Sequence, residues 1–141
     1  MSNTTFTMIK PDAIEANNHG FILEKILASG FKIIAMKMVL LSAYQAKRFY
    51  KIHDGKPFYK DLIDFITRGP VIVAVLNKKN AVEDFRSLIG ATDPNKAENG
   101  TIRKLFAKSV GENAIHGSDS NDNAKIESSF HFSTNEIFNE I

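Results

Sequence analysis

One histidine lies in a stretch of small and polar residues, where an imidazole can reach a substrate. The stretch reads Asn113-Ala114-Ile115-His116-Gly117-Ser118-Asp119-Ser120. A neutral imidazole nitrogen is a good nucleophile near neutral pH when another group fixes the tautomer and orientation of the ring. The candidate orienting groups are Ser118, Asp119 and Glu127. A histidine in a surface turn gives the same pattern, so the spacing alone leaves both interpretations open.

Three basic residues occupy positions that suit anion binding. Lys10 ends a predicted strand, Arg86 lies on a predicted helix, and Arg103 falls in the first turn of a short helix. Guanidinium groups bind phosphate through paired hydrogen bonds, and the amides at a helix start favour anions. A polyphosphate clamp is one interpretation. Ordinary surface charge is the other, because the chain has 18 Lys and Arg residues.

Several other chemistries find no support in the sequence. The chain has neither a Gly-x-Gly-x-x-Gly motif nor a P-loop motif, and it has no cysteine. The four histidines, His19, His53, His116 and His131, lack the short mutual spacing of a metal site. Phe58, next to Pro57, is either a platform that stacks on a base or a core residue at a helix entry.

Length and composition predict a single globular domain over residues 1–141. Hydrophobic residues make up 43% and charged residues 24%, and the formal net charge is only +2. This charge gives no general attraction to nucleic acid or membranes, so an anion site must be local. Without a leader-like start or a long apolar run, we expect a soluble cytoplasmic protein.

Hydrophobic periodicity and turn residues predict the elements that position these side chains. We expect strands at Thr5–Ile9, Phe31–Leu40 and Val71–Leu76, with a last strand somewhere between Asn113 and Phe132. We expect helices at Phe21–Ser29, Ser42 to about Gly55, Pro57–Ile66, Asn80–Ile89, Thr101–Lys108 and Asn121–Ser128. Ser42 with Gln45, and Asn80 with Glu83, have the spacing of helix-capping pairs.

This order of elements favours two helices packed on one face of a mainly antiparallel sheet. A long irregular insertion, Ala91 to Gly117, overlaps the first residues of the polar stretch around His116. Such a segment inside a compact domain is usually either functional or disordered.

Several segments together resemble the nucleoside diphosphate kinase family. The main match is the eight-residue stretch around His116, supported by four others: Thr5-Phe6-Thr7-Met8-Ile9-Lys10-Pro11-Asp12, Lys56-Pro57-Phe58, Gly90-Ala91-Thr92-Asp93-Pro94 and Gly100-Thr101-Ile102-Arg103. The resemblance runs from Phe6 to Phe132. It implies a ferredoxin-like βαββαβ α/β sandwich with an inserted loop before the active-site histidine.

The resemblance also implies an activity and a role for each matched residue. The reaction would move the γ-phosphate of a nucleoside triphosphate to a nucleoside diphosphate through a phosphohistidine, with Mg²⁺ on the nucleotide and low base specificity. His116 matches the nucleophile, Glu127 the carboxylate on its far ring nitrogen, and Ser118 a residue against the ring. Phosphate-holding positions are matched by Lys10, Tyr50, Arg86, Thr92 and Arg103. Lys10 and Asn113 also match contacts to the ribose 3′-hydroxyl, and Phe58 and Val110 match the two sides of the base slot.

Departures from the family pattern bear on stability and assembly rather than on activity. Asn99 stands where many relatives have proline, Arg68 where they often have serine, and Glu15 to His19 differ from the usual loop. The short C-terminus resembles that of tetrameric bacterial relatives, so we expect a homo-oligomer, first a tetramer and second a hexamer. The competing interpretation is a ferredoxin-like nucleotide- or RNA-binding module without catalysis.

Overall fold

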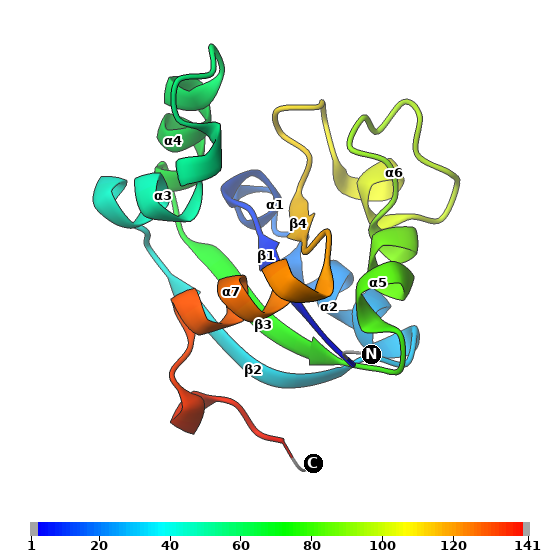
Figure 1. Ribbon diagram of the computed structural model, residues 1–141. Helices are drawn as coiled ribbons and strands as arrows, with labels where there is room; N and C mark the ends of the chain where they lie inside the picture. Colours follow the sequence, from blue (N-terminus) through cyan, green and yellow to red (C-terminus); the bar gives the residue numbers. More distant parts are fainter. Residues whose placement is uncertain (1–2, 140–141) are drawn as a thin grey trace.

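A four-stranded antiparallel sheet is the centre of the computed structural model, which describes residues 3–139. The strands are β1 (Thr4–Ile9), β2 (Lys32–Val39), β3 (Val71–Asn77) and β4 (Ile115–Gly117), in the spatial order β2-β3-β1-β4. Every neighbouring pair in this order is antiparallel. This order and direction confirm the ferredoxin-like arrangement (Figure 1).

Within residues 3–139, seven α-helices and two short 3-10 helices connect and cover the strands. The α-helices are α1 (Pro11–Glu15), α2 (His19–Ala28), α3 (Ala43–Phe49), α4 (Tyr59–Thr67), α5 (Ala81–Ile89), α6 (Ile102–Phe106) and α7 (Asn121–His131). The 3-10 helices are η1 (Lys51–His53) and η2 (Thr134–Glu136). No helix in the described part of the chain has the length and apolar character needed to cross a membrane.

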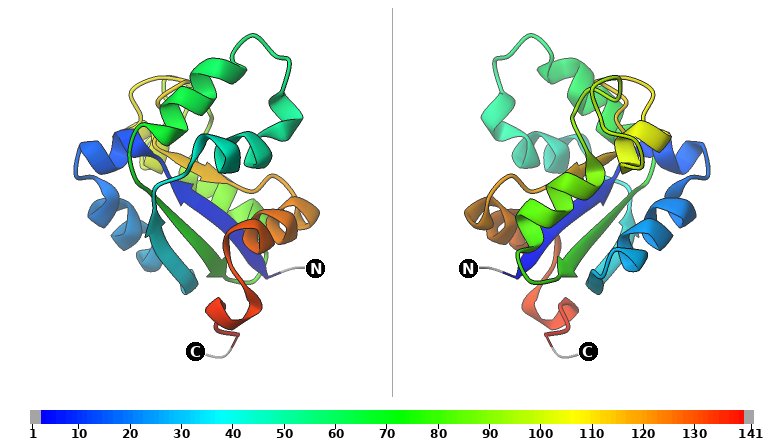
Figure 2. Two further views of the ribbon diagram at one scale, coloured as in Figure 1. Left: turned by 90° about the vertical axis from the view of Figure 1, so that its left-hand side faces the viewer. Right: turned by 90° about the vertical axis from the view of Figure 1, so that its right-hand side faces the viewer.

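Two helices pack on one face of the sheet, as expected, but further helices cover the other face, which was expected to be free of them (Figure 2). Helices α2 and α5 pack on one face, where Ile22, Ile26 and Phe85 join the alternate β3 residues Ile72 and Leu76. Helices α3, α4 and α7 cover the other face. Phe6 of β1, Ile66 of α4 and Phe132, which follows α7, belong to a second hydrophobic cluster there. Strand β3 is therefore buried on both sides, as its continuous apolar run predicts.

The predicted elements are present with shifted ends. Ser42 and Gln45 form the complete capping box, but α3 ends at Phe49 and a 3-10 turn follows instead of further α-helix. Asn80 does not cap α5: its backbone is left-handed at φ 58°, and its side-chain amide donates to Glu83 instead. The short helix α1 was not predicted, because five residues are too few for a periodic signal.

Two residues that depart from the family pattern contact each other. The Arg68 guanidinium donates to both Glu15 carboxylate oxygens, at 3.0 and 2.7 Å, and to Glu112 Oε1 at 2.8 Å. Arg68 holds the pKa of the Glu15 carboxyl below its usual range through this hydrogen bonding. The network joins the ends of α1 and α4 to Glu112 in the insertion, which is the residue before Asn113.

Alanine at Gly117 and alanine at Gly20 should change the free energy of unfolding in opposite directions. A Cβ on Gly117 would lie 2.9 Å from Phe85 Cδ2 and 3.1 Å from Ile89 Cδ1. We expect Gly117→Ala to lower the free energy of unfolding by about 1 to 3 kcal/mol through overpacking. Gly20, in α2, has nothing within 4 Å of such a Cβ, so Gly20→Ala should raise it by about 0.4 to 1 kcal/mol. Urea unfolding of both variants measures the two changes in the free energy of unfolding. Changes of the same sign would contradict the packing described for Gly117 and Gly20.

Candidate active site

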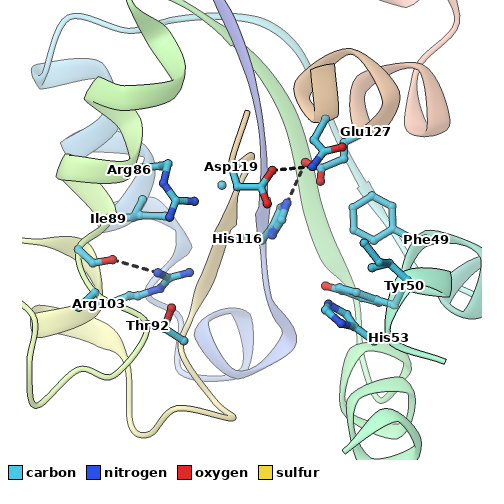
Figure 3. A pocket seen from close by; sticks show the side chains of 15 residues that line it. Phe49, Tyr50, His53, Arg86, Ile89, Thr92, Arg103, His116, Asp119 and Glu127 are labelled. Atoms are coloured by element: carbon cyan, nitrogen blue, oxygen red, sulfur yellow. Dashed lines mark hydrogen bonds and ion pairs between the residues drawn. The ribbon is translucent and has the colours of Figure 1, made fainter. Parts of the chain in front are cut away.

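His116 lies on β4 with its backbone fixed by the neighbouring strand. It pairs with Met8 of β1, and its carbonyl accepts a hydrogen bond from Thr7 Oγ1 at 2.8 Å. The side chain faces a cleft of about 430 Å³ between α5, the insertion, α3 and α7 (Figure 3). The edge strand thus presents the imidazole to the cleft from a rigid backbone.

A carboxylate sets the tautomer of this imidazole. Glu127 Oε1 lies 2.9 Å from His116 Nε2 and also accepts a hydrogen bond from Ser118 Oγ at 2.7 Å. An ionised carboxylate can only accept, so the proton of a neutral imidazole is on Nε2 and Nδ1 keeps a lone pair. No hydrogen-bond partner of Nδ1 is found within residues 3–139. Of the three candidate orienting groups, Glu127 holds the ring and Ser118 holds Glu127.

Aromatic rings limit the movement of His116. Phe49 meets the imidazole edge-on with ring centroids 5.9 Å apart, and the Phe6 centroid lies 6.1 Å away. His131 stacks on Phe6 at 5.1 Å. Burial lowers the pKa of His131 to about 4, so this second histidine is neutral at physiological pH and adds no charge.

Two guanidinium groups face the cleft without a carboxylate partner in the described part of the chain. Arg86 comes from α5 and Arg103 from α6, and both line the cleft. Arg103 donates to the carbonyls of Gly90 at 3.0 Å and Ile115 at 2.7 Å. Burial and the nearby charge of Arg86 lower the pKa of Arg103 to about 10, so it stays charged at neutral pH. Two cations held together without a counter-ion form a site for an anion.

Lys10 and Asn113 do not line the cleft, but Lys10 is close enough to Arg103 to be affected by its charge. Lys10 is buried, and its Nζ donates to Asn113 Oδ1 at 2.8 Å. Burial, followed by the charge of Arg103, lowers the pKa of Lys10 to about 8. Its charge is therefore sensitive to an anion bound nearby.

Other family-matched residues divide between the cleft and its surroundings. Tyr50 and Thr92 line the cleft, and the buried Tyr50 hydroxyl has no hydrogen-bond partner in the described residues. Burial and the charge of Glu127 raise the pKa of Tyr50, so the hydroxyl remains a donor. Phe58 and Val110 do not line the cleft and are 48% and 55% exposed. The structure does not bring these two side chains into the cleft.

Several cleft residues were not among the predicted site residues: Phe49, Ile52, His53, Asp119 and Asn123. Asp119 was considered only as an orienting group for His116; it instead accepts a hydrogen bond from Asn123 Nδ2 at 2.6 Å. The four-residue spacing of Asp119 and Asn123 at the start of a helix was the available signal. Nothing in the local pattern distinguishes Phe49 and His53 from other helix residues.

The fold and the cleft define a ferredoxin-like α/β protein that presents a histidine of fixed tautomer to a cleft with two unpaired guanidinium groups. Residues 3–137 match the family model described as nucleoside diphosphate kinase. The chain belongs to the nucleoside diphosphate kinase family.

Individual relatives agree with this assignment over nearly their whole length. A nucleoside diphosphate kinase of Flavobacterium psychrophilum is 53% identical over 97% of this chain and 99% of its own. One from Prosthecochloris aestuarii is 52% identical over 94% of each chain. Among solved structures, the Aquifex aeolicus nucleoside diphosphate kinase superposes with a TM-score of 0.93 at 39% identity, covering 96% of this chain and 98% of that one. The Halobacterium salinarum enzyme in complex with CDP superposes with a TM-score of 0.95 at 34% identity, covering 100% and 94%.

The lowered pKa of Lys10 predicts proton uptake when a nucleotide binds. At pH 8 the free protein carries Lys10 about half protonated, since its pKa is about 8. Phosphate charge favours the ammonium form, so we expect ADP binding to take up about half a proton and to weaken as the pH rises above 8. Calorimetry in two buffers of different ionisation enthalpy measures this uptake.

The matched control is Lys10→Met, which keeps the length of the side chain and removes its titration. It should bind ADP more weakly at pH 7 and show no corresponding proton uptake at pH 8. Equal uptake by the two proteins would assign the titration to another group.

Proposed function

We propose that the protein transfers the γ-phosphate of a nucleoside triphosphate to a nucleoside diphosphate with His116 as the nucleophile. The Nδ1 lone pair attacks the γ-phosphorus while the bond to the bridging oxygen breaks, and the nucleoside diphosphate leaves with that electron pair. A terminal oxygen of a second nucleoside diphosphate then attacks the same phosphorus, and the phosphorus–nitrogen bond breaks. Since one nucleophile serves both steps in one cleft, the first product leaves before the acceptor binds.

The observation that carries this proposal is the hydrogen bond between His116 Nε2 and Glu127 Oε1 at 2.9 Å. It leaves Nδ1 as the free lone pair and fixes the plane of the ring. As Nδ1 gains the phosphoryl group, positive charge develops on the imidazole, and the adjacent carboxylate stabilises that charge. Ser118 keeps Glu127 in place through its own hydrogen bond.

Cations supply most of the remaining catalysis in this proposal. Phosphoryl transfer passes through a loose transition state with charge spread over the equatorial oxygens. Arg86 and Arg103 are positioned to compensate that charge, with Lys10 next to them. Tyr50 and Thr92 add hydroxyl donors at the cleft wall.

The sugar and base would extend away from this cation pair. We assign the ribose 3′-hydroxyl to Lys10 and Asn113, which already bond to each other. We assign the base to Phe58 and Val110, whose exposure leaves their surfaces available. Stacking between a phenyl ring and an aliphatic group contacts the face of any base, so the base specificity should be low.

Mg²⁺ is also part of the proposal. Within residues 3–139 no group of three or more His, Cys, Asp or Glu side chains is arranged to hold a metal ion. We propose that the ion is carried on the phosphate oxygens of the nucleotide. When bound, Mg²⁺ would neutralise charge on those oxygens, while Arg86, Arg103 and Lys10 orient them.

We further propose a homo-oligomer, with a tetramer favoured over a hexamer. Met36 and Met38 on the edge strand β2 and the adjacent Leu40 are each at least half exposed. Exposed apolar residues on an edge strand support self-association. Sedimentation velocity measures the assembly state. A binding module without catalysis is not favoured, because the relatives that define the family carry the name of the kinase.

His116 labelling tests the proposed nucleophile. ATP labelled at the γ-phosphate should leave acid-labile, base-stable phosphate on the parent protein, and unlabelled GDP or dCDP should remove it. His116→Ala should take up no label. His19→Ala, which changes a histidine outside the cleft, serves as the matched control and should label like the parent. A His116→Ala protein that labels or turns over at the parent rate would contradict the proposal.

The two arginines should differ in their effect on stability. Arg86→Ala should lower kcat by a factor on the order of 10² because transition-state charge is left uncompensated, while the unfolding free energy stays within about 0.5 kcal/mol of the parent. Arg103→Ala should lose activity similarly and also lose about 1 to 3 kcal/mol of stability, because the buried carbonyls of Gly90 and Ile115 lose their donor. Steady-state kinetics and urea unfolding measure both quantities. Parent-like kcat in folded Arg86→Ala would remove Arg86 from the clamp.

A further inference from the structure

The residue two positions before His116 has a strained backbone. Ala114 is fully buried and has a φ of 71°. An L-residue other than glycine rarely adopts this left-handed conformation, because its Cβ lies too close to the carbonyl oxygen. Ala114 therefore stays in this conformation only if the surrounding contacts hold it there.

Those contacts fix nearly every backbone group between Asn113 and His116. The four carbonyls are paired: Lys10 N–H donates to the Ala114 carbonyl at 2.8 Å, Arg103 Nη2 to the Ile115 carbonyl at 2.7 Å, and Thr7 Oγ1 to the His116 carbonyl at 2.8 Å, while the Ile115 N–H donates within the turn to the Asn113 carbonyl at 2.8 Å. The amide of Ala114 itself is paired as well.

Asp12 accepts the hydrogen bond of that amide. Its Oδ2 lies 3.1 Å from the Ala114 nitrogen, and the residue is only 2% exposed in the first turn of α1. Its Oδ1 is also buried and has no hydrogen-bond partner in the described residues. Burying a carboxylate with one unpaired oxygen is costly. An apolar residue of similar size at this position would therefore stabilise the fold about as well. The specific contribution of Asp12 is the acceptor for Ala114.

We propose that Asp12 is a positioning residue for phosphoryl transfer, which acts by holding Ala114 in its left-handed conformation. This inference rests on the proposed function of His116. The left-handed turn directs Asn113 back to Lys10 and the Ile115 carbonyl to Arg103. It also sets the position of Ile115, where β4 begins, and therefore of His116. Asp12 lines no part of the cleft and contacts none of the reacting groups. Its loss should therefore slow transfer without weakening nucleotide binding to the same extent.

A second explanation is that the charge of Asp12 only keeps Lys10 protonated. Asp12 does raise the pKa of Lys10, against the larger effect of burial. Two substitutions separate the explanations. Asp12→Asn and Asp12→Ala both remove the charge beside Lys10, but only the asparagine keeps an oxygen that can accept from the Ala114 amide.

The experiment measures the rate at which His116 is phosphorylated in a single turnover with ATP, together with the ATP concentration that gives half the maximal rate. At pH 7 we expect Asp12→Asn to stay within about threefold of the parent rate and Asp12→Ala to fall about tenfold or more below Asp12→Asn, because small misplacements of reacting groups cost up to about 10²-fold. The half-saturating ATP concentration should differ less than the rate. Equal rates for the two variants would overturn the proposal.

Glycine at position 114 provides an independent test, because it adopts a positive φ without steric cost. In the double variant Asp12→Ala/Ala114→Gly, the rate should return to within about threefold of Ala114→Gly alone. This pair also carries the test if Asp12→Ala does not remain folded. A tenfold loss that persists in the glycine background would overturn the proposal. Absence of label on parent His116 would instead reject the proposed function, so the two failures are distinguishable.

Discussion

The hydrogen bond between Glu127 and His116 is the interaction on which the candidate site depends. It decides which ring nitrogen holds the proton, and only one choice leaves a lone pair toward the cleft. The bond forms because β4 and α7 follow each other through the turn at Ser118 to Ser120, where Ser120 caps the helix and Ser118 bonds to the same carboxylate. A short strand, a cap and a carboxylate on the second turn of a helix thus give one nitrogen a defined chemical role.

The cleft that His116 faces contains cationic side chains without acidic partners among the described residues. Elsewhere on the chain several basic side chains have acidic partners, such as Lys60 with Asp64 and Arg68 with Glu15 and Glu112. In the cleft, Arg86 and Arg103 have no such partner among the described residues, and burial already lowers the pKa of Arg103 and Lys10. Folding has therefore brought like charges together, two of them buried, an arrangement that costs stability and that a bound polyphosphate would relieve.

Much of the fold could be predicted because local rules and global packing agree there. The Ser42 capping box, the apolar run of β3 and the turn after α2 each specify their element from a few neighbouring residues. The second helical layer could not be predicted, because no local pattern says which face of the sheet a helix will cover. The histidine, its carboxylate and the arginines were candidates by residue type and position, and the motif resemblance selected them, whereas Phe49 and His53 reach the cleft only through the tertiary arrangement. The left-handed Ala114 was equally hidden, since alanine carries no signal for a positive φ.

The length of strand β4 has a consequence for the geometry at His116. It has three residues, and its partner β1 lies more than a hundred positions earlier, as the 109-residue separation of Thr7 and His116 illustrates. Closing such a long loop costs more entropy than the pairing of β2 with β3, which are closer in the sequence. The same shortness makes β4 the strand most easily detached from the native sheet. The geometry at His116 therefore depends on the pairing of a three-residue strand, whereas most of the core lies on the longer strands and on the helices.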